Sequence, residues 1–455
     1  MEKKPNIVLI TIDSLRADFV GFQNELEKNT PFLDSLAKKS YIFTNAIAPA
    51  NPTFFCFCSL MTGSLPFAFG NYLGIPDNPN IKTVAEVLKK NGYATAAFLG
   101  DSPGLYSIYG YQKGFDLYDD GFEETDKAYL SFLEFLWKLR EKIPDGILSI
   151  IETTRTFIKT IFLSPKHSVS GNQLNEKVIK YFQDKKNKPF FLWLHYMDNH
   201  LPYYSGLNKN FFKDKNPLQR LINKLIFYKE LSTSLRRMKT KNQKITEIFK
   251  EAYRNSIKYT DEQVGKIVSY INRKYPNTVF IVTSDHGEAF MDHGVVGHGT
   301  LSLYNELIRV PMIINLPDGK THANSNTVSL VSLAKTIASI ASVKKVQFKG
   351  NNLLVDKIFS PINNFSRVLY NCNPQVELGI LDNETEIKGY KNLWSFTTDK
   401  EKYILHEDGG KEEYYNLSND PCEKNNLIKS KQKIKSKIIG KLQKIIKVSS
   451  AGNSS

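Results

Sequence analysis

The sequence is poor in cysteine: four stand in 455 residues, at positions 56, 58, 372 and 422. They form no Cys-x-x-Cys pair and offer no disulfide framework, which fits a reducing compartment. We therefore expect a cytoplasmic protein. Cys56 and Cys58 alternate along an apolar run and are expected to be buried thiols.

Long apolar runs are also missing. The first one, within "NIVLITID", ends at Asp13 and is far too short for a signal peptide or a membrane span. In the helical pattern of residues 125–165, charges at Glu152, Arg155 and Lys159 exclude a span. We expect this segment to be a helical cap on the core, with contact to a membrane surface as the alternative.

Acidic residues are scarce in two segments. Residues 208–250 hold 12 Lys/Arg and 3 Asp/Glu, and residues 428–448 hold 8 Lys and no acid. The formal net charge of +15 therefore comes from these two segments, and the rest of the chain is close to neutral. For this reason we do not expect nucleic acid as a partner. Solvated helix faces are the simplest interpretation, and an anionic membrane surface or a polyanionic substrate is the alternative.

Apolar runs typical of buried parallel strands alternate with helical patterns. The runs cover residues 6–13, 93–100, 189–198, 277–287 and 310–316, and the helical patterns cover 30–40, 83–92 and 259–275. This order predicts an α/β fold with a doubly wound, mostly parallel sheet flanked by helices.

The length fits one large domain and a smaller one. We expect a catalytic domain over residues 1–344, with insertions at 125–165 and 203–250. From about residue 345 the sequence pattern changes to short strand-like segments separated by turn residues. This pattern predicts a small α+β subdomain up to residue 430. A basic tail, 431–455, is expected to dock on its own domain, with a membrane surface as the alternative.

Candidate functional residues stand at the ends of the predicted strands. These are Asp13, then His195 and Asp198, then Asp285 and His286. In doubly wound sheets, sites form beyond the carboxyl ends of the strands. Carboxylate and imidazole suit Zn²⁺, Mn²⁺ or Fe²⁺ or, where carboxylates dominate, Mg²⁺ or Ca²⁺, so we expect one or two divalent metal ions.

Five motifs together carry a family resemblance. "PNIVLITIDSLRAD", "TGSLPF", "KPFFLWLHYMDNHLPY", "SDHGEAFMDHGVVGHGTLSLYNELIRVPMII" and "KEEYYNLSNDPCEKNNL" stand in this order over about residues 5–430. The chain resembles the sulfatase branch of the alkaline phosphatase superfamily. The resemblance implies an alkaline-phosphatase-like fold and a metal-bound nucleophile that attacks a phosphate or sulfate ester.

The resemblance also identifies a nucleophile. Sulfatases carry Cys-x-Pro-Ser-Arg, with the Gly of a Thr-Gly pair ten residues after the Cys. Counting back from Gly63 reaches Thr53, so neither Cys56 nor Cys58 is in register. Thr53 resembles the metal-bound threonine of phosphate-handling relatives such as nucleotide pyrophosphatases and phosphoglycerol transferases.

The same comparison implies a metal site of Asp13, Thr53, Asp285 and His286. Where sulfatases have two adjacent Asp this chain has Asp13-Ser14, and His286 stands where they often have Asn. An imidazole in place of an amide oxygen favours a transition metal over Ca²⁺.

Roles for the other polar residues are less specific. His298 stands where sulfatases have a substrate-binding Lys, and it either contacts substrate or, as we favour, completes a second metal site with Asp198 and His200. His200 resembles a substrate-contacting His. Arg16 touches the anionic group or pairs with a neighbouring acid. His195 is interpreted as a packed strand residue, and His293 as loop structure.

We therefore predict a metal-dependent esterase or transferase, cytoplasmic or membrane-peripheral, that acts on an anionic ester, phosphate before sulfate. The alternatives are a true sulfatase and a degenerate binding protein of the same fold. The sequence carries no signal for the oligomeric state.

Overall fold

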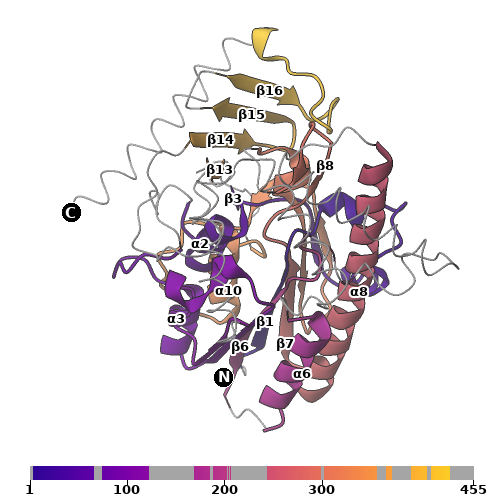
Figure 1. Cartoon of the computed structure of the whole chain (residues 1–455). Helices are drawn as coiled ribbons and strands as arrows, with labels where there is room; N and C mark the ends of the chain where they lie inside the picture. The colour runs from indigo at the N-terminus through magenta and orange to yellow at the C-terminus, as the bar shows by residue number, and fades with distance from the viewer. Residues whose placement is uncertain are drawn as a thin grey trace, which may run out of the picture.

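The structure is a computed structural model (Figure 1). It describes residues 4–65, 74–121, 169–184, 188–201, 203, 205, 243–298, 302–355, 365–370, 391–406 and 411–430. The predicted cap 125–165, most of the insertion 203–250 and the tail 431–455 lie outside these residues. Among the described helices, none combines the length and the apolar character that a membrane crossing requires.

A nine-stranded sheet forms the centre of the molecule. Its order is β11-β2-β10-β7-β1-β6-β4-β5, with β12 also beside β2. The bounds are β1 Asn6–Ile12, β2 Tyr41–Ile47, β4 Ala94–Leu99, β5 Leu117–Asp119, β6 Phe190–Tyr196, β7 Thr278–Thr283, β10 Arg309–Asn315, β11 His322–Asn324 and β12 Val328–Ser329. The expected doubly wound, mostly parallel sheet is confirmed.

One predicted strand runs against its neighbours. β10 pairs antiparallel with both β2 and β7, whereas β1 pairs parallel with β6 and β7, and β4 pairs parallel with β5 and β6. A strand that is buried on both faces has a continuous apolar sequence, and such a sequence does not indicate whether the strand runs parallel or antiparallel to its neighbours.

Helices cover both faces of the sheet (Figure 1). One face packs on α2 Thr53–Thr62, α3 Val84–Lys90 and α10 Ser332–Ile340, and the other on α1 Pro31–Ala37, α6 Gly171–Tyr181 and α8 Gln243–Lys274. Alternate residues of β1 divide between these two cores: Ile7 and Leu9 face the first, and Val8 and Ile10 face the second. Cys56 and Cys58 are buried in the first core, as predicted.

The helix predicted over 259–275 begins earlier than expected. α8 starts at Gln243, inside the segment assigned to the basic insertion. Phe249, Ala252, Tyr253 and Ile257 continue the apolar stripe of the later turns and are buried in the second core. This packing explains why the helix includes its basic first turns.

A second sheet lies beside the first, in the order β16-β15-β14-β13-β3 (Figure 1). The C-terminal strands are β13 Phe365–Tyr370, β14 Lys391–Thr397, β15 Glu401–His406 and β16 Glu412–Asn416. β3, Ala50–Asn51, stands directly before α2 and pairs parallel with β13. We call this five-stranded sheet the C-terminal sheet.

A buried ion pair of the C-terminal part bonds to Leu303 and Asn305, where the C-terminal sheet meets the rest of the molecule. Lys402 Nζ lies 2.6 Å from Glu423 Oε1, and neither side chain is exposed. Lys402 Nζ also donates to the carbonyl of Leu303 (2.9 Å) and to Asn305 Oδ1 (2.8 Å). Glu423 Oε2 accepts from the Asn305 backbone N–H (2.6 Å), so both charges are satisfied across the junction.

We expect Lys402→Met to lower the free energy of unfolding by about 3–5 kcal/mol, because it leaves the Glu423 carboxylate buried without its cation. Urea unfolding checks this. The matched control is Lys266→Met in the exposed Lys266–Glu262 pair, where the loss should stay below about 1 kcal/mol. Equal losses in the two variants would contradict this account of the junction.

Candidate active site and metal centre

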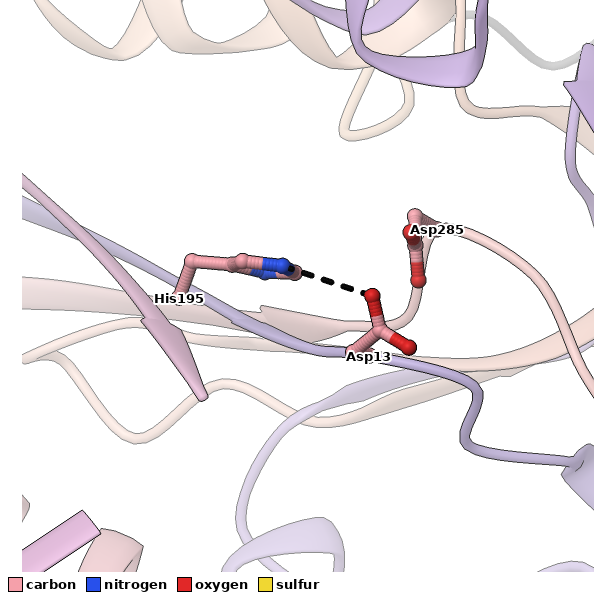
Figure 2. Close-up of side chains that lie close together, drawn as sticks. All are labelled: Asp13, His195 and Asp285. Atoms are coloured by element: carbon pink, nitrogen blue, oxygen red, sulfur yellow. Dashed lines mark ion pairs between the residues drawn. The ribbon is translucent and has the colours of Figure 1, made fainter. Parts of the chain in front are cut away.

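Parallel pairing brings three polar side chains to one edge of the central sheet. Thr11 of β1 stands opposite His195 of β6 and Thr283 of β7. Asp13 follows β1 and Asp285 follows β7, so their carboxylates meet the His195 ring at the carboxyl ends of the strands. Figure 2 shows the three side chains converging.

This cluster has the composition of a metal site. One ligand atom from each of Asp13, His195 and Asp285 lies within 4.8 Å of the others, and all three residues are buried. His195 Nε2 lies 3.5 Å from Asp13 Oδ2. His195 Nε2 and Asp285 Oδ2 are buried and have no hydrogen-bond partner. Two unpartnered ligand atoms beside a third carboxylate fit a divalent cation.

Thr11 sets the orientation of the His195 ring. The Thr11 hydroxyl lies 3.2 Å from the Leu194 carbonyl and 2.9 Å from His195 Nδ1, and it accepts from Trp193 Nε1. The Thr11 hydroxyl has a single proton. When it donates this proton to the Leu194 carbonyl, His195 Nδ1 must donate to Thr11 Oγ1. His195 Nε2 then carries no proton, and its lone pair faces Asp13. That is the tautomer that a metal ligand needs.

Asp13 is held in its charged form. Burial alone would raise its pKa, but the neighbouring imidazoles of His195, His200 and His286 lower the pKa well below its usual value. Ser14 Oγ also donates to Asp13 Oδ1 (2.6 Å), and the Ser14 backbone N–H donates to Asp285 Oδ1 (3.3 Å).

Thr53, the first residue of α2, places its hydroxyl against this cluster. Its Oγ1 lies 3.3 Å from Asp13 Oδ2 and 3.0 Å from His286 Nε2. His286 Nδ1 lies 2.8 Å from the carbonyl of Gly287, which can only accept, so Nδ1 carries a proton. The single hydroxyl proton of Thr53 goes either to Asp13 Oδ2 or to His286 Nε2. The structure thus brings together Asp13, Thr53, Asp285 and His286, the four residues of the predicted metal site.

His298 pairs with a buried carboxylate in this site. His298 directly follows a short hairpin formed by β8, Ala289–Phe290, and β9, Val296–Gly297. His298 Nδ1 lies 3.2 Å from Oε1 of the fully buried Glu288. Burial would lower the pKa of His298, but the charge and hydrogen bond of Glu288 raise it to about 9. The His298 ring centroid lies 4.5 Å from that of His286 and 4.8 Å from that of His200, whose pKa burial lowers.

The expected second metal site is not formed by the residues that the structure describes. Asp198 accepts from the Gly171 backbone N–H (3.0 Å) and from Ser205 Oγ (2.5 Å), and burial raises its pKa to about 6. Within the described part of the chain, the Asp13, His195 and Asp285 cluster is the group of three close ligands. Asp198 therefore caps α6, and His298 Nδ1 faces Glu288.

Arg16 pairs with acids, the second of its two expected roles. Its guanidinium lies 2.7 Å from Asp18 and 2.9 Å from Asp292, and it donates to the Glu288 carbonyl (2.9 Å). The side chain is 6% exposed, so its donors are used within the protein. Arg16 thereby holds the hairpin that carries Glu288 and His298.

His293 forms part of the loop structure, as interpreted. Its Nδ1 lies 2.6 Å from Glu306 Oε1, and its ring stacks on Tyr304 with centroids 3.6 Å apart. His195, a strand-end candidate that was interpreted as a packed strand residue, belongs to the ligand cluster, and Glu288 was not predicted. The position of His195 beside a strand end was a usable signal for it, and Glu288 directly follows the Asp-His-Gly motif.

Comparisons with known proteins agree with this architecture. A family model described as "Sulfatase" matches residues 5–343. An uncharacterized sulfatase of Escherichia coli (strain K12), YidJ, is 22% identical over 94% of this chain and 83% of its own length. An arylsulfatase of Clostridium perfringens is 25% identical over 94% of this chain and 91% of its own. A phosphonate monoester hydrolase of Agrobacterium radiobacter superposes with a TM-score of 0.67 at 17% identity, covering 98% of this chain and 96% of its own.

Removing His195 should weaken metal binding. We expect His195→Ala to lower the affinity for Zn²⁺ or Mn²⁺ by about tenfold or more, because one of three close ligand atoms is lost. Titration calorimetry and metal analysis of the purified protein measure this. The control is His322→Ala, which changes an exposed histidine of β11. Unchanged metal affinity in His195→Ala would remove His195 from the site.

The Arg16 contact predicts a pH dependence of stability. Burial would raise the pKa of Asp292, but Arg16 lowers it to about 2. A folded pKa below the unfolded value of about 3.9 stabilises the fold above that value, here by about 2 kcal/mol, and the benefit is lost as the pH falls toward 2. We expect the difference in free energy of unfolding between wild type and Asp292→Asn to have its full value at pH 7 and roughly half of that value at pH 3. Urea unfolding at the two pH values measures this difference. A gap that is independent of pH would contradict the pairing.

Proposed function

Because the chain belongs to the sulfatase family of hydrolases, which act on sulfuric or phosphoric ester bonds, we propose that it is a metal-dependent esterase with Thr53 as its nucleophile. The observation that carries this proposal is the position of Thr53 Oγ1, 3.0 Å from His286 Nε2 and 3.3 Å from Asp13 Oδ2. The hydroxyl thus touches both an imidazole that can accept its proton and a carboxylate of the metal cluster.

Asp13, His195 and Asp285 would hold the divalent metal, with Thr53 beside them. Bound there, the cation would lower the pKa of the Thr53 hydroxyl and offset charge on the transferring group. Two carboxylates and imidazole nitrogen favour Zn²⁺ or Mn²⁺ among the expected metals. The unpartnered His195 Nε2 and Asp285 Oδ2 support this assignment.

The protein itself contributes to activating Thr53. His286 Nε2 is positioned to take the hydroxyl proton, since its Nδ1 is committed to the Gly287 carbonyl. Thr53 also begins the ten-residue helix α2, whose positive amino-terminal end stabilises negative charge on Oγ1.

We propose that His298 binds the anionic group of the substrate rather than a second metal. Its Nδ1 pairs with Glu288, which keeps the ring positively charged beside His286 and Thr53. The neutral His200 ring lies against it and is a candidate hydrogen-bond donor or acceptor for the same group. A cation and a metal together would suit a doubly charged group.

A threonine nucleophile favours phosphate over sulfate esters. A formylglycine enzyme can expel sulfate from its hydrated aldehyde, whereas a threonine ester has no such escape and must be cleaved by water or by an acceptor alcohol. Hydrolysis and phosphoryl transfer are therefore both open to this site. The second candidate is a sulfate esterase, which the names of the two sulfatase relatives favour.

A non-catalytic role is the weaker alternative, because Asp13, Thr53, Asp285 and His286 are all present and in contact.

Location in the cytoplasm is part of the proposal. It rests on the free, buried thiols of Cys56 and Cys58.

We expect Thr53→Ala to abolish turnover and Thr53→Ser to retain part of it, because Ser keeps the hydroxyl. Cys56→Ala is the control and should stay active. Hydrolysis of 4-nitrophenyl phosphate, bis-4-nitrophenyl phosphate and 4-nitrophenyl sulfate measures both the nucleophile and the preferred ester. Mass spectrometry of trapped enzyme should find a phosphoryl group on Thr53.

Two outcomes would overturn this assignment. One is full activity in Thr53→Ala. The other is a formylglycine in place of Cys56 or Cys58, together with sulfate cleavage faster than phosphate cleavage.

A further inference from the structure

The turn that follows β1 has an unusual backbone conformation. Ser14, directly after Asp13, has a φ of 56°, in the left-handed region. Few residues other than glycine adopt this region, and they keep it only where the surrounding structure holds them there. The groups that hold the turn, residues 14–16, therefore bear on the candidate metal site beside it.

Ser14 orients both carboxylates of the metal cluster. Its hydroxyl donates to Asp13 Oδ1 (2.6 Å), and its backbone N–H donates to Asp285 Oδ1 (3.3 Å). The second oxygen of each carboxylate is left for the cluster. Asp13 Oδ2 lies 3.5 Å from His195 Nε2, and Asp285 Oδ2 has no hydrogen-bond partner among the described residues. Since the two carboxylates lie beside each other (Figure 2), a shift of the turn would move both ligand atoms.

Tyr253, a residue of α8, holds the turn at both of its ends. Its hydroxyl donates to the Ser14 carbonyl (2.5 Å) and accepts from the Arg16 backbone N–H (2.9 Å). Between these two bonds, the Leu15 backbone N–H donates to Ser284 Oγ (2.8 Å), directly after β7. The turn is thus bonded to α8 and to the end of β7, and these contacts are buried.

The Tyr253 ring is itself fixed by packing. Its centroid lies 5.1 Å from that of Phe19, 5.1 Å from that of Phe290 and 5.5 Å from that of Tyr203, and the side chain is not exposed. A phenylalanine would fill the same space in the second core. The hydroxyl is therefore the part of Tyr253 that the core does not need, and the early turns of α8 deliver it to the turn after β1.

We propose that Tyr253 is a positioning residue for the metal site. Its hydroxyl fixes the turn 14–16 and, through Ser14, fixes the carboxylates of Asp13 and Asp285. This inference rests on the proposed metal-dependent function. Tyr253 acts through backbone groups of the turn, so it is neither a metal ligand nor a catalytic residue.

The test is Tyr253→Phe, which removes the hydroxyl and keeps the ring. The matched control is Tyr93→Phe, because the Tyr93 side chain is also buried and its hydroxyl also donates to a backbone carbonyl, that of Pro5 (3.1 Å). Tyr93 directly precedes β4 and Pro5 directly precedes β1. The control bond therefore lies at the amino ends of the strands, at the edge of the sheet opposite the site. Urea unfolding checks that both variants fold.

The first readout is the affinity for Zn²⁺ or Mn²⁺, measured by titration calorimetry. Loss of a group that orients a metal ligand directly costs about 10–100-fold in affinity. Because Tyr253 acts one contact further away, we expect a loss of about fivefold in Tyr253→Phe and of less than about twofold in Tyr93→Phe.

The second readout is the visible spectrum of the Co²⁺-loaded protein, which depends on the number and geometry of the ligands. We expect the bands to change in position or intensity in Tyr253→Phe and to match those of the wild type in Tyr93→Phe. A purely structural role of Tyr253 would lower the stability and leave this spectrum unchanged.

A measurement on the wild type tests the same link without a substitution. If the Tyr253 contact favours metal binding, metal binding must favour the contact to the same extent. Addition of Zn²⁺ should therefore slow amide hydrogen exchange over residues 250–257 of α8, around Tyr253. Residues 265–274 of the same helix are the control and should not change. Equal exchange with and without Zn²⁺ over 250–257 would contradict the link.

The outcomes separate this inference from the proposed function. A wild type that binds neither Zn²⁺ nor Mn²⁺ would refute the metal-dependent function itself. Weaker binding in His195→Ala, with wild-type affinity and an unchanged Co²⁺ spectrum in Tyr253→Phe, would leave the metal site in place and show that the positioning role is wrong. Equal losses of affinity in the two tyrosine variants would also overturn the role. None of these readouts depends on Thr53 or on the type of ester.

Discussion

The parallel pairing of β1 with β6 and β7 is the constraint on which the site depends. It places three strand ends at one edge, so residues far apart in sequence, Asp13, His195 and Asp285, share one small volume. The apolar side chains that alternate between the two helical layers fix this register, because a slip by one residue would exchange the faces of the strand. The same alternation thus packs both cores and aligns the ligands.

A second constraint acts on the hairpin that carries Glu288 and His298. From the large domain, Arg16 holds it through Asp292 and the Glu288 carbonyl. From the loop that follows β16 of the C-terminal sheet, the Lys424 ammonium contacts the Asp292 carbonyl, and the Glu423 carbonyl contacts His293. The C-terminal sheet is therefore part of the support of the site, and the buried Lys402–Glu423 pair anchors that support.

Much of this could be predicted from the sequence. Apolar runs located the main strands, and the strand-end rule identified Asp13 and Asp285, because both signals are local. The direction of β10 could not be predicted from the sequence, because a strand that is buried on both faces has the same apolar pattern in a parallel and in an antiparallel arrangement. His195 resembled a core residue until its register with Thr11 placed it against Asp13. The pairing of Glu288 with His298 needs the β8–β9 hairpin, in which Ala289 stands opposite Gly297, and the intervening sequence gives no strong strand pattern.

The pairing of β3 with β13 has a consequence for synthesis of the protein. β3 leads directly into Thr53, yet its partner strand is far along the chain: Ser366 donates to the carbonyl of Ala48, 318 residues earlier. At 5–20 residues per second, a ribosome needs roughly 15–60 seconds to make that stretch. Until then the strand before the nucleophile has an open edge in the nascent chain. The active site therefore matures late in translation, and a chain that is released early would carry the catalytic residues without the sheet that completes their support.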